Sequence, residues 1–154
     1  MKKIRIYLDT SVINFLFADD APEARMTTIE LFENYIKPGV YDAYISPVVI
    51  DEINRTPDVE KRRMLLKAIR DYEVKVLDID AYREEIEKLA VSYIDQGVIP
   101  RKKLEDALHV AISTVEEMDA LISWNYKHLA NIFKERRIIS VNLSEGYIRS
   151  LKIC

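Results

Sequence analysis

The sequence predicts an α/β fold, in which a five-stranded parallel sheet is covered by helices on both faces. Three observations predict it. Short runs of strand-like residues alternate with longer stretches of helical character along the 154-residue chain. The five short runs are separated by helices, which is the pattern of a covered parallel sheet. Only three glycines and five prolines occur and they do not cluster, so we expect one domain spanning residues 1–154.

The first strand is predicted over residues 3–9. There Ile4, Ile6 and Leu8 alternate with other side chains, and the run ends in Asp9. The other four strands are expected over residues 41–45, 73–77, 119–123 and 138–141.

Capping signals predict where the helices begin. Ser46-Pro47 combines an N-cap residue with proline in the first helical turn, and so predicts a helix over 47–54. The other helices are expected from Thr10 or Ser11 to Phe17, from Asp20 to Lys37, from Thr56-Pro57 to Asp71, from Asp80 to Asp95, and over 101–116, 125–134 and 144–150.

Composition and charge exclude several classes of protein. The chain is 49% hydrophobic and carries 23 Lys and Arg against 26 Asp and Glu, so it has neither a disordered composition nor a basic nucleic-acid coat. Cys154 is the sole cysteine, which excludes an internal disulfide and a cysteine-based zinc site. No apolar run approaches the roughly 20 residues of a membrane span, and Arg5 and Asp9 interrupt the stretch that a signal peptide would need. We therefore expect a cytoplasmic protein without a membrane partner.

Four polar residues are expected at one edge of the sheet. Asp9 ends the first strand, Glu52 lies on the helix after the second strand, Asp106 begins the helix before the fourth strand, and Asn125 follows that strand. Parallel sheets place ligands beyond the carboxyl ends of their strands. Three carboxylates facing one cleft would repel one another unless a cation neutralised them. Oxygen ligands favour Mg²⁺ or Mn²⁺, and such an ion can activate water and stabilise charge on a phosphodiester.

Each of these residues alone also has a purely structural interpretation. Asp9 and Asn125 can cap the helices that follow them. Glu52 has a like-charged neighbour, as residues on surface helices commonly do, and Asp106 can interact with its helix dipole. The metal-site hypothesis therefore depends on the combination.

Three segments in order resemble the PIN-domain family. They are Tyr7-Leu8-Asp9-Thr10-Ser11-Val12-Ile13, Glu52 after Ser46-Pro47, and Leu104-Glu105-Asp106-Ala107-Leu108-His109-Val110-Ala111. The resemblance implies a three-layer α/β/α fold with strand order 3-2-1-4-5 and metal-dependent cleavage of RNA. Many small members of the family resemble the VapC toxins of toxin–antitoxin pairs.

The resemblance also implies roles for individual residues. Asp9, Glu52 and Asp106 match the first three acidic positions of the family, which bind the metal ion. Thr10 or Ser11 matches a hydroxyl position that supports the site. The fourth acidic position falls at Asn125, which brings no charge, so the expected site is a single-metal centre or has a weak second metal position.

Further residues near these segments are candidates for substrate contact. His109 lies three residues after Asp106, on a similar helix face, and Lys127 and His128 follow the site segment, where they could meet a phosphate. Trp124 could stack on a base, and Arg101-Lys102-Lys103 could form a basic rim. The competing interpretations are a structural histidine, a core tryptophan and solvated charges.

Two other α/β enzyme classes fit less well. A haloacid-dehalogenase site would need a second acidic residue two positions after Asp9, where Ser11 stands. A response-regulator receiver would need an aspartate after the third strand and a lysine late in the sheet. The sequence contains no glycine-rich phosphate loop, which argues against P-loop and Rossmann nucleotide sites.

The expected partners follow from the resemblance to VapC toxins. They are an RNA substrate, a second copy in a homodimer, and an antitoxin that places a basic residue in the acidic cleft. The non-enzymatic alternative is a catalytically weak or inactive PIN-like module that binds RNA or protein, and the neutral Asn125 favours it. Metal-dependent cleavage that is lost when Asp9 is neutralised separates these two hypotheses.

Overall fold

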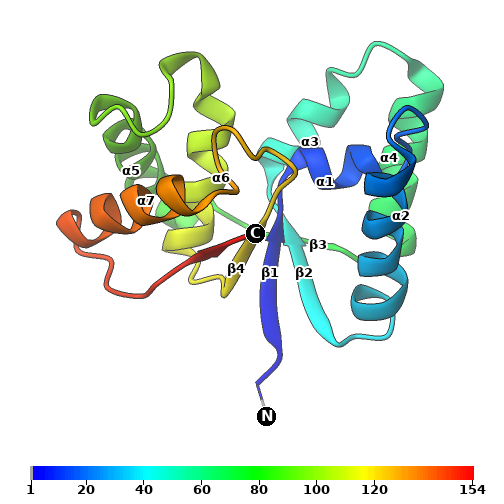
Figure 1. Ribbon diagram of the computed structural model, residues 1–154, viewed down its shortest axis with the longest axis horizontal. Helices are drawn as coiled ribbons and strands as arrows, with labels where there is room; N and C mark the ends of the chain where they lie inside the picture. The colour runs from blue at the N-terminus through cyan, green and yellow to red at the C-terminus, as the bar shows by residue number, and fades with distance from the viewer. Residues whose placement is uncertain (1) are drawn as a thin grey trace.

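A computed structural model, which describes residues 2–154, contains one five-stranded sheet with the order β3-β2-β1-β4-β5 (Figure 1). All four strand pairs are parallel. The strands are β1 (Ile4–Leu8), β2 (Tyr41–Ile45), β3 (Lys75–Val76), β4 (Ala120–Ile122) and β5 (Lys152–Ile153). The predicted fold class and strand order are confirmed.

Helices cover both faces of this sheet. Figure 1 shows α1 to α4 on one side of the strands and α5 to α7 on the other. The α-helices are α1 (Thr10–Phe15), α2 (Pro22–Leu31), α3 (Pro47–Asn54), α4 (Val59–Asp71), α5 (Arg83–Asp95), α6 (Leu104–Val115) and α7 (Ile132–Ser144). A π-helical turn η1 (Phe32–Ile36) extends α2, and the 3₁₀ turns η2 (Asp80–Tyr82) and η3 (Arg101–Lys103) precede α5 and α6. Within residues 2–154, no helix combines the length and the apolar character that crossing a membrane requires.

The central strand β1 is buried on both faces. Ile6, Tyr7 and Leu8 are successive residues, and each is at most 2% exposed. A parallel strand between two helical layers has no solvent face, so its buried residues follow one another instead of alternating. Leu121 of β4 and Ile45 of β2 continue this core on either side.

The last strand and the last helix lie elsewhere than the sequence predicts. Residues 138–141 belong to α7, and the fifth strand is β5. Ile138, Val141 and Asn142 are buried at a spacing of three and four residues, which is helical, although the β-branched run resembles a strand. Helical residues thus begin at Ile132 instead of 125, and the predicted helix over 144–150 is absent from the described chain.

The caps expected for α1, α2, α4 and α5 are also wrong. Asp9, and not Thr10 or Ser11, is at the N-cap position of α1. Helix α4 is capped by Asp58, whose side chain accepts backbone N–H bonds, and not by Thr56. Helix α2 begins with Ala21 at its N-cap position, so the side chain of Asp20 does not cap it. Asp80 opens the short turn η2 before α5. By contrast, α3 spans the predicted residues 47–54.

A buried polar cluster joins the three helices on one face of the sheet. The Tyr93 hydroxyl of α5 donates to the Asn142 side chain of α7, and Asn142 Nδ2 donates to Thr114 Oγ1 of α6 at 3.2 Å. Tyr93 is fully buried and Asn142 is 1% exposed. Because buried polar groups must be paired to be tolerated, this cluster fixes how the three helices pack.

Replacing Asn142 with Ala should lower the free energy of unfolding by about 1–3 kcal/mol, because the Tyr93 hydroxyl then loses its buried acceptor. Urea denaturation of both proteins measures this difference. Replacing the exposed Leu143 with Ala is the matched control on the same helix, and equal stability of the Asn142 variant and wild type would contradict the role of the cluster.

Candidate active site

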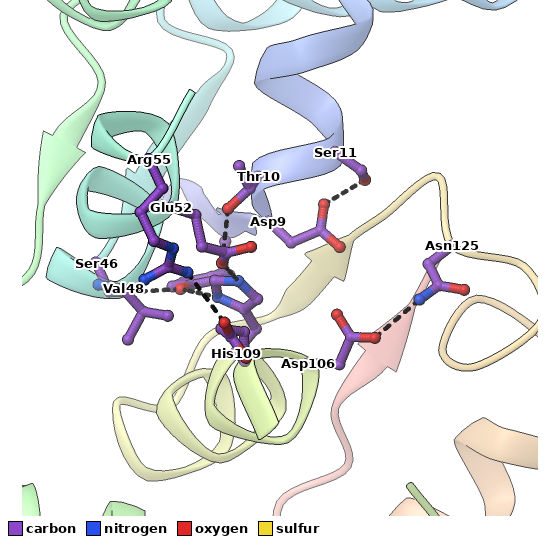
Figure 2. A network of polar contacts seen from close by, with 12 residues as sticks. Asp9, Thr10, Ser11, Ser46, Val48, Glu52, Arg55, Asp106, His109 and Asn125 are labelled. Carbon is purple, nitrogen blue, oxygen red and sulfur yellow. Dashed lines mark hydrogen bonds and ion pairs between the residues drawn. The ribbon is translucent and has the colours of Figure 1, made fainter. Parts of the chain in front are cut away.

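A pocket of about 210 Å³ opens beyond the carboxyl end of β1. Figure 2 shows the carboxylates of Asp9, Glu52 and Asp106 turned toward this space, with Asn125 beside Asp106. The residues that line it are Asp9, Thr10, Ser11, Asn14, Glu52, Asp106, His109 and Asn125. The structure thus brings together the four polar residues that the sequence places at one sheet edge.

Strand pairing brings these segments into one place. The register of β1 with β4 sets Leu8 opposite Ile122, and the Asp9 N–H continues the ladder by donating to the Ile122 carbonyl at 3.2 Å. The Trp124 N–H then donates to Ser11 Oγ at 2.9 Å. The loop after β4 is therefore tied to the start of α1, next to the pocket.

Asp9 occupies the N-cap position of α1, but its carboxylate makes no capping bond. Its Oδ1 instead accepts a hydrogen bond from the Ser11 hydroxyl, and the residue is 3% exposed. Its Oδ2 accepts no hydrogen bond from residues 2–154. The capping interpretation of this side chain is thus replaced by one in which the carboxylate faces the pocket.

Glu52 projects from α3 and is held by two neighbours. Thr10 Oγ1 donates to Glu52 Oε1 at 2.9 Å, and His109 Nε2 lies 2.6 Å from the same oxygen. Burial raises the pKa of Glu52, but the hydrogen bonds and charge of His109, the Thr10 hydroxyl and the nearby Arg55 outweigh it, so the pKa lies below the usual value. Glu52 is therefore an ionised carboxylate.

The pKa of Asp106 lies above its usual value, whereas that of Glu52 lies below. Burial raises the pKa of Asp106, and the negative charges of Asp9 and Glu52 raise it further, against the lowering effect of His109 and Lys103. Asp9 and Glu52 are therefore close enough to Asp106 for their charges to act on it. Burial and these charges together disfavour the ionised form of Asp106.

The Asn125 side chain contacts both the loop after β4 and a carboxylate of the pocket. Its Oδ1 accepts the His128 N–H at 3.0 Å, which caps a turn and not a helix. Its Nδ2 donates to Asp106 Oδ2 at 2.9 Å. The amide therefore closes the loop and orients a carboxylate of the pocket.

The residues predicted to bind substrate differ in their exposure and in their contacts. Thr10 and Ser11 line the pocket, but their hydroxyls hold Glu52 and Asp9. Lys127 is exposed on the loop after β4, outside the pocket lining. His109 is 1% exposed and both its ring nitrogens contact protein groups, so the structure gives it internal contacts where we expected a substrate contact.

Trp124 also has internal partners. Its indole N–H donates to Thr28 Oγ1 at 2.9 Å, and its ring stacks on Phe15 with 5.2 Å between centroids. These contacts anchor the loop after β4 to α1 and α2. The core interpretation of this tryptophan therefore fits its position better than base stacking.

Three residues at or beside the pocket, namely Tyr7, Asn14 and Ser46, are not among the predicted site residues. Tyr7 is fully buried, and its hydroxyl contacts His109 Nδ1 at 2.6 Å and Ser46 Oγ at 2.7 Å. A buried tyrosine needs a partner for its hydroxyl, and Tyr7 lies two positions before Asp9. The position of Tyr7 in a predicted core strand indicates that its hydroxyl needs a partner, but the partners Ser46 and His109 are distant in the chain.

The donor set fits a hard divalent cation. Asp9 Oδ2, Glu52 Oε2 and Asp106 Oδ1 accept no hydrogen bond from residues 2–154, while the other oxygen of each carboxylate does. In the described part of the chain, no three Asp, Glu, His or Cys side chains are gathered tightly enough to enclose an ion by themselves. Mg²⁺ usually keeps several waters and takes one or two carboxylates, so an open set of this kind suits it.

Positive charges lie beside the acidic pocket. Burial lowers the pKa of His128, and surrounding lysines lower it further. We call these four residues the lysine rim: Lys102, Lys103, Lys127 and Lys134. Of these lysines, Lys103 also acts on the pocket carboxylate of Asp106.

Comparison with known proteins identifies the class of this chain. The model of the PIN domain matches residues 6–132, which is most of the sequence. The chain therefore belongs to the PIN-domain family. A comparison with curated protein sequences gives no match.

One solved structure with a similar fold is VapBC2 from Rickettsia felis bound to a DNA fragment from their promoter. The TM-score is 0.59 at 15% sequence identity, and the alignment covers 98% of this chain and 99% of that chain. This similarity supports the fold assignment.

Replacing Asp106 with Asn should stabilise the metal-free protein at pH 7. The folded state raises the pKa of Asp106, so wild type loses stability as the pH rises through that pKa, whereas the variant does not. The Asn125 amide can still donate to the new side chain.

The difference in stability between Asp106→Asn and wild type should shrink as the pH falls toward the usual aspartate pKa of about 3.9. Thermal melts in a chelating buffer between pH 4 and 8 measure it. Asp51→Asn, on an exposed residue of α3, is the control. A variant that is less stable than wild type at pH 7 would contradict the proposed repulsion.

Proposed function

We propose that this protein is a metal-dependent endoribonuclease that cleaves phosphodiester bonds of RNA with Mg²⁺ or Mn²⁺. The observation that carries the proposal is the convergence of Asp9, Glu52 and Asp106 from three separate elements on one pocket. Membership of the PIN-domain family supports it. Burial and the charges of Asp9 and Glu52 raise the pKa of Asp106, and a bound cation would favour its ionised form.

Each residue has a role in this proposal. Asp9 and Asp106 would bind the ion, directly or through water, and Glu52 would orient the attacking water or complete the ligand set. Asn125 would hold Asp106 in place through its 2.9 Å hydrogen bond. When bound, the ion would activate water and stabilise the charge that develops on the phosphate.

The lysine rim gives the acidic pocket a means of attracting RNA. A pocket of carboxylates repels a phosphate backbone, and the lysine rim, of which Lys102 and Lys127 are exposed, would offset that repulsion. Lys103 is close enough to lower the pKa of Asp106, and Lys127 is exposed on the neighbouring loop. The backbone of an RNA strand would therefore contact the lysines while one phosphate reaches the ion.

We further propose that the protein is the toxin of a toxin–antitoxin pair and forms a homodimer. The structural similarity to VapBC2 supports the first part. Large exposed apolar side chains support an interface with another chain, namely Ile132, Phe133 and Leu143 near the ends of α7 and Ile148 in the segment that follows it. An antitoxin that inserts a basic side chain into the pocket would neutralise the same carboxylates as the metal ion.

Cleavage of a fluorescently labelled single-stranded RNA tests the proposed reaction. Wild type should cleave it with Mg²⁺ or Mn²⁺ and stop when the ions are chelated. Asp9→Asn and Asp106→Asn should each lose about 100-fold or more of the rate, because removing a metal ligand costs at least as much as removing its supporting groups. Asp51→Asn should cleave like wild type.

The variants must also melt as folded proteins for this comparison. Full activity of both pocket variants at equal thermal stability would overturn the assignment. RNA binding without cleavage by wild type would instead favour the alternative of a binding module.

Replacing Asn125 with Asp adds a fourth carboxylate and tests whether this residue belongs to the metal site. Mn²⁺ should bind about tenfold more tightly or better, because a further charge acts at short range on a partly desolvated cation. Without metal the variant should be less stable than wild type, since a carboxylate then replaces the donor to Asp106. Calorimetric titration with Mn²⁺ measures the affinity.

The competing role for Asn125 is to cap the turn through Oδ1, which aspartate does equally well. Unchanged affinity and stoichiometry would therefore remove Asn125 from the metal site. Asn131→Asp, at the N-cap of α7, is the matched control.

A further inference from the structure

A row of buried polar groups ends on Glu52. Ser46 Oγ lies 2.7 Å from the Tyr7 hydroxyl, which lies 2.6 Å from His109 Nδ1, and His109 Nε2 lies 2.6 Å from Glu52 Oε1. Ser46 and Tyr7 are fully buried and His109 is 1% exposed. Each of these three residues comes from a different element, at the end of β2, in β1 and in α6. The row thus connects the interior of the sheet to the pocket.

The direction of the hydrogen bonds follows from the ends of the row. An ionised Glu52 can only accept, so His109 Nε2 must carry a hydrogen. In the neutral imidazole, Nδ1 then accepts from the Tyr7 hydroxyl, and Tyr7 accepts from Ser46. Ser46 Oγ in turn accepts the Val48 N–H at 3.2 Å. Every hydrogen is accounted for, and each points toward Glu52.

Tyr7 is suited to remain the donor in this row. Its hydroxyl is fully buried between Ser46 Oγ and His109 Nδ1, so both of its hydrogen-bonding partners belong to the row. The donor to Glu52 is therefore the Nε2–H group of His109.

These contacts fix one oxygen of Glu52 and leave the other for the pocket. Thr10 and His109 both act on Oε1, from opposite sides of the carboxylate in Figure 2. Two donors on one oxygen restrict rotation of the group about its last bond. Oε2 is then the oxygen presented to whatever occupies the pocket.

We propose that His109, supported by Tyr7, is a positioning residue that holds Glu52 so that its free oxygen faces a divalent cation. This proposal rests on the proposed function, because it assigns a part in the same metal site. A histidine that touches neither metal nor substrate acts here only through the carboxylate. Supporting groups of this kind typically change metal affinity by about 10–100-fold when removed.

A merely structural role for His109 predicts a different result. Filling the same buried space with an apolar side chain would then change stability alone. A positioning role predicts that metal affinity falls even where the protein stays folded, and that a side chain with an amide donor restores it. The two roles are therefore separable by binding measurements on folded variants.

Calorimetric titration with Mn²⁺ of wild type, His109→Leu, His109→Gln and Tyr7→Phe makes this test. His109→Leu should bind Mn²⁺ about 10–100-fold more weakly. His109→Gln should lie near wild type, because its amide can donate to Glu52, and Tyr7→Phe should show a smaller loss than His109→Leu. Thermal melts establish that each variant is folded.

Two further measurements distinguish positioning from loss of packing. Asn142→Ala removes a buried polar group from another cluster and should destabilise the protein without changing Mn²⁺ affinity. In the RNA cleavage assay His109→Leu should lower kcat with little change in KM, and excess Mn²⁺ should recover part of the rate.

The measurements distinguish failure of the positioning role from failure of the proposed function. Wild-type affinity in His109→Leu, with wild type itself binding Mn²⁺ and cleaving RNA, would overturn the positioning role and leave the proposed function standing. Failure of His109→Gln to recover affinity while folded would also overturn it. A wild-type protein that binds no Mn²⁺ would overturn the proposed function and the positioning role together.

Discussion

Parallel pairing of β1 with both of its neighbours is the constraint on which the site depends. Because the central strands run in the same direction, their carboxyl ends meet at one edge of the sheet, and the segments that follow them must share that edge. Asp9 continues the β1–β4 ladder through its own N–H, so the first carboxylate is placed by the backbone itself. Glu52 and Asp106 then approach it from α3 and α6, on opposite faces of the sheet.

The charge that this geometry gathers is only partly compensated within the described chain. A protein donor satisfies one oxygen of each carboxylate: the Ser11 hydroxyl for Asp9, the Asn125 amide for Asp106, and Thr10 with His109 for Glu52. These donors orient the carboxylates but, apart from a protonated His109, bring no positive charge. Burial and the charges of Asp9 and Glu52 raise the pKa of Asp106, so its ionised form is destabilised in the folded protein. A cation in the pocket would stabilise that form, which links the stability of the fold to the chemistry that we propose.

Local signals in the sequence were sufficient for much of the fold and for the acidic part of the site. The Ser46-Pro47 cap predicts α3 with its observed bounds. Asp9 is predicted at a strand end, Glu52 on the helix after the second strand and Asp106 at a helix start, and the resemblance to the PIN-domain family supports this set. The run of β-branched residues at 138–141 misleads, because only the tertiary structure shows that Ile138 and Val141 are buried on one helix face. Short apolar runs do not distinguish a strand from a buried helix by themselves.

Local sequence patterns do not predict the row of contacts from Ser46 to Glu52. The Tyr7 hydroxyl meets a histidine that is 102 positions away in the chain, and no local pattern encodes that contact. The role of Asn125 is similar, since its amide serves the turn through one atom and Asp106 through the other.

In the proposed site, the pocket binds a divalent cation between its carboxylates. Crystals grown without divalent metal and then soaked in Mn²⁺ reveal the ion through its anomalous scattering. We expect an anomalous peak in the pocket, within ligand distance of Asp9 and Asp106 or of waters that they hold. An ordered pocket with no peak, at a concentration that labels carboxylates elsewhere on the surface, would contradict it.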